Sequence, residues 1–263
     1  MLGPKKIEVR TDDGVAPCFL HRPDASADVD LRSNAHYPGV IMYPDAGSVR
    51  AASMEMAARL ASHGYVVLLP HIFYRAGEYA PFDPRTVFDN PPERERLMTL
   101  VRSLDMADAM RDARHYIRTL EEQPDTLPGR VGCVGYCIGG RLAFTTAGVH
   151  TERVGAAASI HGGMIASDQP NSPHKNSAKI QAKLYFAIAD NDPSCTPEHQ
   201  GMLVSSLASA HIDFTVEHFA DCKHGFAMPD FPMYDQAAAE RQWARVIELF
   251  ASGLGSRAER VKD

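Results

Sequence analysis

Residues 130–141, RVGCVGYCIGGR, are the most informative stretch of this chain. The apolar residues 131–134 predict a buried strand of a parallel sheet, and a helix is expected to follow the glycines. Between them, Gly135-x-Cys137-x-Gly139-Gly140 predicts a turn so sharp that a side chain two residues before or after the cysteine would clash. This is the pattern of a nucleophile elbow, which lifts the sulfur toward the amides and the positive dipole end of the next helix. Those groups favour a thiolate and a developing oxyanion.

A second interpretation of the same stretch is a glycine-rich phosphate loop with an incidental buried cysteine. A phosphate loop requires Lys followed by Ser or Thr after its last glycine, whereas Gly140 is followed by Arg141 and Leu142. The pattern therefore favours the elbow.

Strands and helices alternate on both sides of this turn. An Asp-Gly turn at 13–14 predicts an antiparallel hairpin, and the other segments predict an α/β fold with a mostly parallel, doubly wound sheet and helices on both faces. We expect one domain over 1–263, with a long irregular loop at 71–96 that is functional or lid-like. The predicted strands are 6–10, 15–21, 40–43, 65–69, 131–134, 154–160, 182–189 and 213–219; the predicted helices are 49–63, 97–121, the helix after the elbow, 197–210 and 234–254.

Composition excludes several classes of protein. The 263 residues include 44% hydrophobic and 23% charged residues, as in a soluble globular protein, and the net charge of −6 gives no electrostatic support for binding nucleic acid. No apolar run approaches the roughly 18 residues of a membrane span, and the N-terminus lacks the apolar segment of a signal peptide. Five cysteines without a C-x-x-C pair indicate reduced thiols. We therefore expect a cytoplasmic protein without metal, cofactor, nucleic-acid or membrane partner.

A cysteine nucleophile requires a base to take its proton and an acid to orient that base. Downstream of Cys137, Asp192 follows the predicted strand 182–189 and His224 follows the strand 213–219. Because parallel strands end at the same edge of a sheet, we expect all three side chains to lie together there. Asp190 competes for the role of the acid, since either aspartate could instead cap the next helix. His161 and His218 are alternatives to His224.

These segments resemble the dienelactone hydrolase family of α/β-hydrolases. The resemblance rests on Gly135-Tyr136-Cys137-Ile138-Gly139-Gly140, on the Asp-Pro step at 192–193 and on His224-Gly225-Phe226, and it extends over nearly the whole chain. It implies the α/β-hydrolase fold and a Cys137–His224–Asp192 triad that cleaves an ester or lactone through an acyl-thioester. It also implies an oxyanion hole formed by the backbone N–H groups of Ile138 and Ala46.

The resemblance extends to the residues around the substrate. The family has an acid, usually glutamate, that interacts with the resting nucleophile, and Asp45 stands at that position; its alternative role is helix capping. Arg75 matches by position the arginine that binds the substrate carboxylate, although it could equally be a solvated loop residue. Met228 stands where the family has a second arginine. With Phe226, Tyr79 and Phe82 it suggests a more apolar pocket, unless these residues belong to the core.

The sequence therefore predicts a cysteine-dependent hydrolase of small carboxylic esters or lactones, monomeric or homodimeric. The alternative is a protein of the same fold that binds a small ligand without hydrolysis or senses redox state through its thiols. For a redox sensor, Cys222 is the candidate resolving cysteine because it lies near His224 in the sequence.

Overall fold

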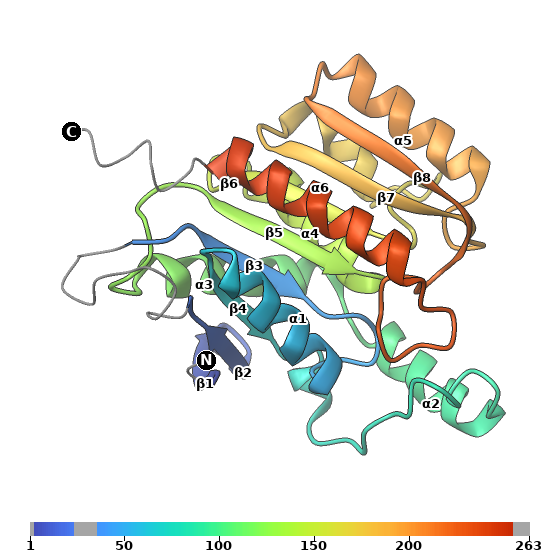
Figure 1. Ribbon diagram of the computed structural model, residues 1–263, viewed down its shortest axis with the longest axis horizontal. Coiled ribbons are helices and arrows are strands. Elements are labelled where there is room, and N and C mark those ends of the chain that lie inside the picture. Colours follow the sequence, from blue (N-terminus) through green and yellow to red (C-terminus); the bar gives the residue numbers. More distant parts are fainter. Residues whose placement is uncertain (1–2, 24–35, 255–263) are drawn as a thin grey trace.

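An eight-stranded sheet organises the computed structural model, which describes residues 3–23 and 36–254 (Figure 1). The strand order is β1-β2-β4-β3-β5-β6-β7-β8. Strands β3 to β8 are parallel, and β2 joins β4 in antiparallel pairing to add the N-terminal hairpin β1–β2. The α/β prediction, with its mostly parallel sheet and N-terminal hairpin, is confirmed. The strands are β1 Lys5–Thr11, β2 Gly14–His21, β3 Gly39–Tyr43, β4 Val66–Pro70, β5 Val131–Tyr136, β6 Val154–Ile160, β7 Lys183–Asn191 and β8 Phe214–Lys223.

Helices cover both faces of the sheet. Helices α1 and α6 pack on the face seen in front in Figure 1, and α3, α4 and α5 share a core with the opposite face. Strands β3, β4, β5 and β6 are buried at every position because both of their faces are covered. The helices are α1 Ala51–Ser62, α2 Pro91–Arg102, α3 Met106–Glu121, α4 Ile138–Val149, α5 Pro197–Ser209 and α6 Gln236–Leu254, and short 3₁₀ helices span Tyr74–Ala76 and Pro173–Lys179. None of the helices in the described ranges is long and apolar enough to cross a membrane.

The predicted helix 97–121 is in fact two helices, and the first of them begins inside the predicted loop 71–96. Helix α2 begins after Asn90, whose side chain accepts a hydrogen bond from the Glu93 N–H, and it has proline in its first turn. Helix α3 begins after Asp105, whose carboxylate accepts hydrogen bonds from the N–H groups of Ala107 at 2.8 Å and Asp108 at 3.0 Å. The first N–H groups of a helix have no acceptor within the helix, and these two side chains supply one. Each of them therefore stabilises the start of a separate helix.

The carboxyl ends of five parallel strands bring the chemically interesting residues to one edge of the sheet. The loop after β3 contains Asp45 and Ala46, Cys137 follows β5, His161 follows β6, Asp192 follows β7 and His224 follows β8. Strand β8 extends to Lys223, four residues beyond the predicted end, so His224 leaves the sheet directly. Helix α2 lies beyond this edge (Figure 1).

Candidate active site

Cys137 occupies a backbone conformation that few residues adopt. It stands between β5 and α4 with φ 56° and ψ −121°. A Cβ at Gly135 would lie 1.9 Å from the carbonyl oxygen of Gly139, and a Cβ at Gly139 would lie 2.4 Å from the carbonyl oxygen of Tyr43. Side chains are therefore excluded on both sides of the cysteine, and the turn can close only with glycine. The result places the half-buried sulfur at the N-terminus of α4.

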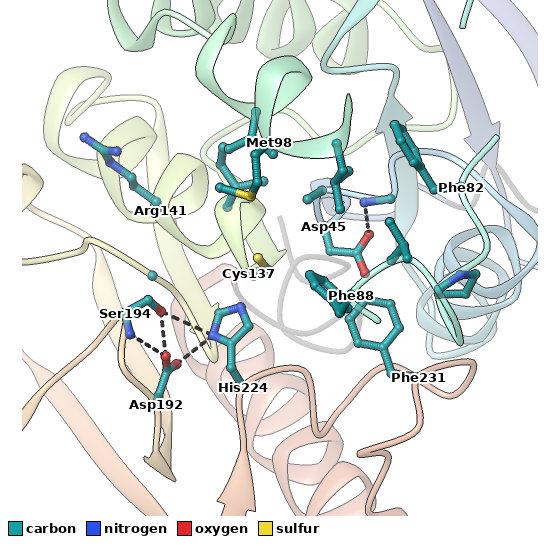
Figure 2. A pocket seen from close by; sticks show the side chains of 18 of the residues that line it. Asp45, Phe82, Phe88, Met98, Cys137, Arg141, Asp192, Ser194, His224 and Phe231 are labelled. Carbon is teal, nitrogen blue, oxygen red and sulfur yellow. Dashed lines mark hydrogen bonds and ion pairs between the residues drawn. The ribbon is translucent and has the colours of Figure 1, made fainter. Parts of the chain in front are cut away.

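His224 is held by an acid on the neighbouring strand. Its Nδ1 lies 2.7 Å from Oδ2 of Asp192. The other oxygen, Oδ1, accepts hydrogen bonds from Ser194 through its N–H at 2.8 Å and its hydroxyl at 2.6 Å. Asp192 is buried whereas Asp190 is exposed, so the structure pairs His224 with Asp192. Figure 2 shows the imidazole between Asp192 and the sulfur of Cys137.

The electrostatics of this pair favour a charged imidazole. Burial by itself lowers the pKa of His224, but the charge of Cys137 and the hydrogen bonds to Asp192 and Cys137 outweigh it and raise the pKa well above its usual value. Burial raises the pKa of Asp192, but its hydrogen bond to His224 and the contacts with Ser194 bring it below the ordinary range. An imidazolium beside a sulfur is therefore the state that this geometry stabilises, and it can donate a proton to a leaving group.

The loop after β3 supplies a second wall of the site. Ala46 and Ile138 both line the pocket of Cys137. Within the described part of the chain, neither of their N–H groups donates a backbone hydrogen bond. An oxyanion hole requires N–H groups that are free in this way.

The carboxylate of Asp45 pairs with Arg50 rather than with the thiol of Cys137. Its carboxylate accepts two hydrogen bonds from Arg50, at 2.6 and 2.9 Å, and one from the Gly47 N–H at 2.9 Å. Burial raises the pKa of Asp45, and the charge of Arg50 opposes that rise. Arg50 also donates to Asp230 at 2.6 and 2.9 Å, which connects this loop to the loop after β8. Asp45 thus fixes the backbone that carries Ala46.

A cavity of about 470 Å³ opens above Cys137 (Figure 2). Its wall opposite the sulfur is apolar and comes from residues 82–101 and from Phe231. Arg141, one helical turn after Cys137, lies at its border with the guanidinium pointing away from the sulfur (Figure 2). This wall is formed by Phe82, Pro84, Val87, Phe88, Leu97, Met98, Val101 and Phe231, and Met164 and Pro193 also line the cavity.

Several residues that we expected in this pocket lie elsewhere. Arg75 pairs with Asp112 at 2.6 Å and Asp13 at 2.7 Å, against the hairpin and α3, and does not line the cavity. Tyr79 lines a neighbouring cavity of about 500 Å³. The structure therefore does not place either side chain in the lining of the cavity at Cys137.

Phe226 and Met228 are also outside the cavity. Both are almost fully buried in the core on the α1 and α6 face of the sheet. Phe226 stacks on Phe219 with ring centroids 4.8 Å apart. They are core residues, because the loop after β8 turns back over the sheet before it reaches Phe231.

Of the apolar wall, the sequence indicated only Phe82, which lines the cavity as expected. Leu97 and Val101 are four residues apart, a helical spacing that could have indicated one covered face of α2. Phe88 and Phe231, whose rings are 6.1 Å apart, join the chain near α2 to the loop after β8. Nothing local in the sequence indicates that pairing.

The other four thiols are buried. Burial raises the pKa of Cys18 and of Cys195 to about 12, and it also raises the pKa of Cys133 and Cys222. Cys222 does not line the cavity of Cys137.

Across residues 3–23 and 36–254, no group of three or more His, Cys, Asp or Glu side chains is arranged to hold a metal ion.

Comparison with known proteins places this geometry in context. The sequence profile of the Dienelactone hydrolase family matches residues 27–254. A carboxymethylenebutenolidase of Pseudomonas sp. strain P51 is 26% identical over 223 residues, which are 85% of this chain and 88% of the relative. A dienelactone hydrolase-like promiscuous phosphotriesterase, P91, from metagenomic libraries has the same fold, with a TM-score of 0.75, 21% identity and coverage of 95% and 98% of the two chains. Thermogutta terrifontis esterase 2 superposes with a TM-score of 0.67 at 15% identity, covering 97% of this chain and 96% of its own.

Proposed function

This chain belongs to the dienelactone hydrolase family and is a hydrolase of ester bonds, and from that premise we propose that Cys137 is its nucleophile, with His224 as base and Asp192 as the acid that orients it. The observation that supports this most directly is the Asp192–His224 hydrogen bond of 2.7 Å next to a cysteine in a glycine-flanked turn. The substrate is a small carboxylic ester or lactone.

In the first half-reaction, the Cys137 thiolate attacks the carbonyl carbon of the substrate. The carbonyl electron pair moves to oxygen, and the N–H groups of Ile138 and Ala46 stabilise the oxyanion. When the intermediate collapses, the C–O bond breaks and the His224 imidazolium gives its proton to the departing alcohol. The acyl group remains on the sulfur as a thioester.

In the second half-reaction, neutral His224 takes a proton from water as the water attacks the thioester. The acid product leaves with the water oxygen, and the sulfur departs as thiolate beside the restored imidazolium. Asp192 keeps the His224 proton on Nδ1, so that Nε2 faces the reacting atoms (Figure 2). No outside reactant besides water is needed.

The cavity favours an uncharged substrate of modest size. About 470 Å³ accommodates a small organic molecule, and the wall that faces Cys137 is apolar. Arg75, the arginine expected from its sequence position to bind a substrate carboxylate, is paired with Asp112 and Asp13, and Met228 stands at the second position. We therefore expect p-nitrophenyl esters with short apolar acyl chains to be better substrates than esters that bear a carboxylate.

The test compares wild type, Cys137→Ala and Cys222→Ala on p-nitrophenyl acetate and on a small unsaturated lactone. Cys137→Ala should lower kcat by roughly a thousandfold or more, because the nucleophile is lost while His224 and Asp192 remain. Cys222→Ala should keep wild-type kcat, since that thiol is buried outside the cavity. Mass spectrometry of acid-quenched wild type should find the acyl group on Cys137. Undiminished turnover in Cys137→Ala would refute the proposed nucleophile.

A further inference from the structure

His161 lies directly beneath the elbow although it belongs to another strand. It follows β6, is only 1% exposed and has a left-handed backbone with φ 38°. Its N–H donates to the Ala187 carbonyl of β7 at 2.8 Å. A left-handed conformation is costly for a residue other than glycine, so the surrounding structure must hold it in place.

The imidazole of His161 contacts the peptide of the nucleophile. Its Nδ1 accepts a hydrogen bond from the Cys137 N–H at 3.2 Å, and that N–H also donates to the Ile160 carbonyl at 3.1 Å. An accepting Nδ1 has no proton, so the ring is neutral with its proton on Nε2. A protonated ring would place two N–H groups against each other and open the turn.

The same ring contacts the candidate base. The rings of His161 and His224 meet edge to face with centroids 5.2 Å apart. Phe226, at 5.5 Å, and Tyr136, at 6.0 Å, pack around His161. One rigid side chain therefore touches both the peptide that carries the sulfur and the imidazole that faces it.

Two further observations agree with a neutral ring held for its geometry. Burial, reinforced by the charge of His224 and opposed by Asp192, lowers the pKa of His161 well below its usual value. The Nε2 atom is buried and has no hydrogen-bond partner among the described residues. A buried donor without a partner is unfavourable, so the fold keeps this ring at a cost in stability.

We propose that His161 is a positioning residue: as a neutral imidazole it fixes the Cys137 peptide and the His224 ring relative to each other, so that the sulfur and the base meet. This inference rests on the proposed roles of Cys137 and His224. The titratable groups that face His161 are His224, Asp192, Cys137 and Tyr136.

Two substitutions separate the contacts of His161. In His161→Asn, the amide oxygen replaces Nδ1 as acceptor for the Cys137 N–H, and asparagine tolerates a left-handed backbone. In His161→Phe, the ring is kept but the acceptor is lost. Thermal unfolding of both variants is measured alongside, as a check on the fold.

The main readout is the pH profile of Cys137 alkylation by iodoacetamide, followed by peptide mapping. In His161→Phe we expect the plateau rate to fall roughly tenfold to a hundredfold, the scale of a small misplacement of a reacting group. The inflection should move to higher pH, since the thiolate is held less well against His224. The loss in the logarithm of the plateau alkylation rate should be at most half as large in His161→Asn as in His161→Phe. With p-nitrophenyl acetate, kcat should fall more in His161→Phe than in His161→Asn. The KM of both variants should stay within about twofold of the wild-type value.

Wild-type rate and inflection in His161→Phe would overturn the proposal. So would equal rate losses in both variants with an unchanged inflection, because packing alone would then explain them. If neither variant folds, nitrogen NMR of wild type decides: His161 should keep an unprotonated Nδ1 while His224 titrates, and a His161 that titrates with it refutes the proposal.

Alkylation also separates this inference from the proposed hydrolysis. Alkylation needs no substrate, so a wild type that hydrolyses no ester contradicts the proposed function and leaves the His161 comparison intact. Cys137→Ala identifies the signal, since the four other thiols are buried.

Discussion

At Gly135 the chain leaves no space for a methyl group, because a Cβ would lie 1.9 Å from the Gly139 carbonyl oxygen. We expect Gly135→Ala to lower the free energy of unfolding by more than about 3 kcal/mol, since backbone atoms cannot move aside as a flexible side chain can. Urea denaturation followed by circular dichroism measures the change. Wild-type stability in this variant would mean that the turn is not as tight as described.

Gly201 provides the matched control. It lies inside α5, and a Cβ there would meet nothing within 4 Å. Gly201→Ala should therefore raise the free energy of unfolding by about 0.5–1 kcal/mol, through the lower entropy of the unfolded chain. The two glycines should differ in the sign of the effect.

A second prediction at the residue scale concerns the charge of His224. Burial opposes the charged form, and Cys137 is the largest contribution that raises the pKa. Cys137→Ala should therefore lower the His224 pKa, and Cys222→Ala should leave it unchanged; proton NMR of the imidazole against pH measures both. An unchanged His224 titration in Cys137→Ala would show that the sulfur does not face the ring.

The raised pKa also makes stability depend on pH. The free energy of unfolding that the His224 charge contributes is fully present below the unfolded pKa of about 6.5, and it is lost as pH rises through the folded pKa.

At the scale of elements, the carboxylate of Asp105 determines where α3 begins. It accepts hydrogen bonds from the Ala107 and Asp108 N–H groups. Asp105→Ala should lower the free energy of unfolding by about 1 kcal/mol, whereas Asp105→Asn should keep most of the stability because its amide oxygen can still cap. Chemical denaturation of the two variants tests the difference, and equal stabilities would contradict the capping role.

The sequence predicted elements well where one local signal dominates. Buried runs such as β5 and the glycines of the elbow have few alternatives, and each was placed within two residues. The break between α2 and α3 was missed because the residues 97–121 are apolar at helical spacing on both sides of Asp105, and a single capping side chain decided the outcome.

At the scale of the whole molecule, Arg50 joins loops that are 180 residues apart in the chain. It donates to the buried Asp45 after β3 and to Asp230 after β8, and its guanidinium lies 5.5 Å from the Phe231 ring. Arg50→Met should lower the free energy of unfolding by about 3–5 kcal/mol, because it leaves the Asp45 charge buried without a partner. It should also lower kcat, since Asp45 holds the loop of Ala46.

The double variant Arg50→Met with Asp45→Asn gives the control for this prediction. It removes both charges, so it should be more stable than Arg50→Met alone. Urea denaturation and the kcat for p-nitrophenyl acetate are measured on the same samples. If the two variants were equally stable, the buried charge of Asp45 would not be the cause of the loss.

The site was predictable to the extent that topology determines it. Cys137, Asp192 and His224 meet because each follows the carboxyl end of a parallel strand, a consequence of the α/β order. Apart from Phe82, the wall of the cavity was not predictable, since it depends on how α2 and the loop of Phe231 fold over that edge. Arg75 was misplaced for a similar reason: only the tertiary structure shows that Asp112 of α3 and Asp13 of the hairpin neutralise it.

The strand order has a consequence for how copies of this chain behave when they are crowded. A strand at the margin of a sheet has a free row of backbone N–H and C=O groups that can recruit a strand from another molecule. At one margin, β1 carries the charged Lys5, Lys6, Glu8 and Arg10. At the other, β8 carries the exposed Asp221 and Lys223, and the exposed Arg241 lies beside it in a pair with Glu217. An added strand would have to desolvate these charges at either margin, so the sheet resists growth into aggregates from both sides.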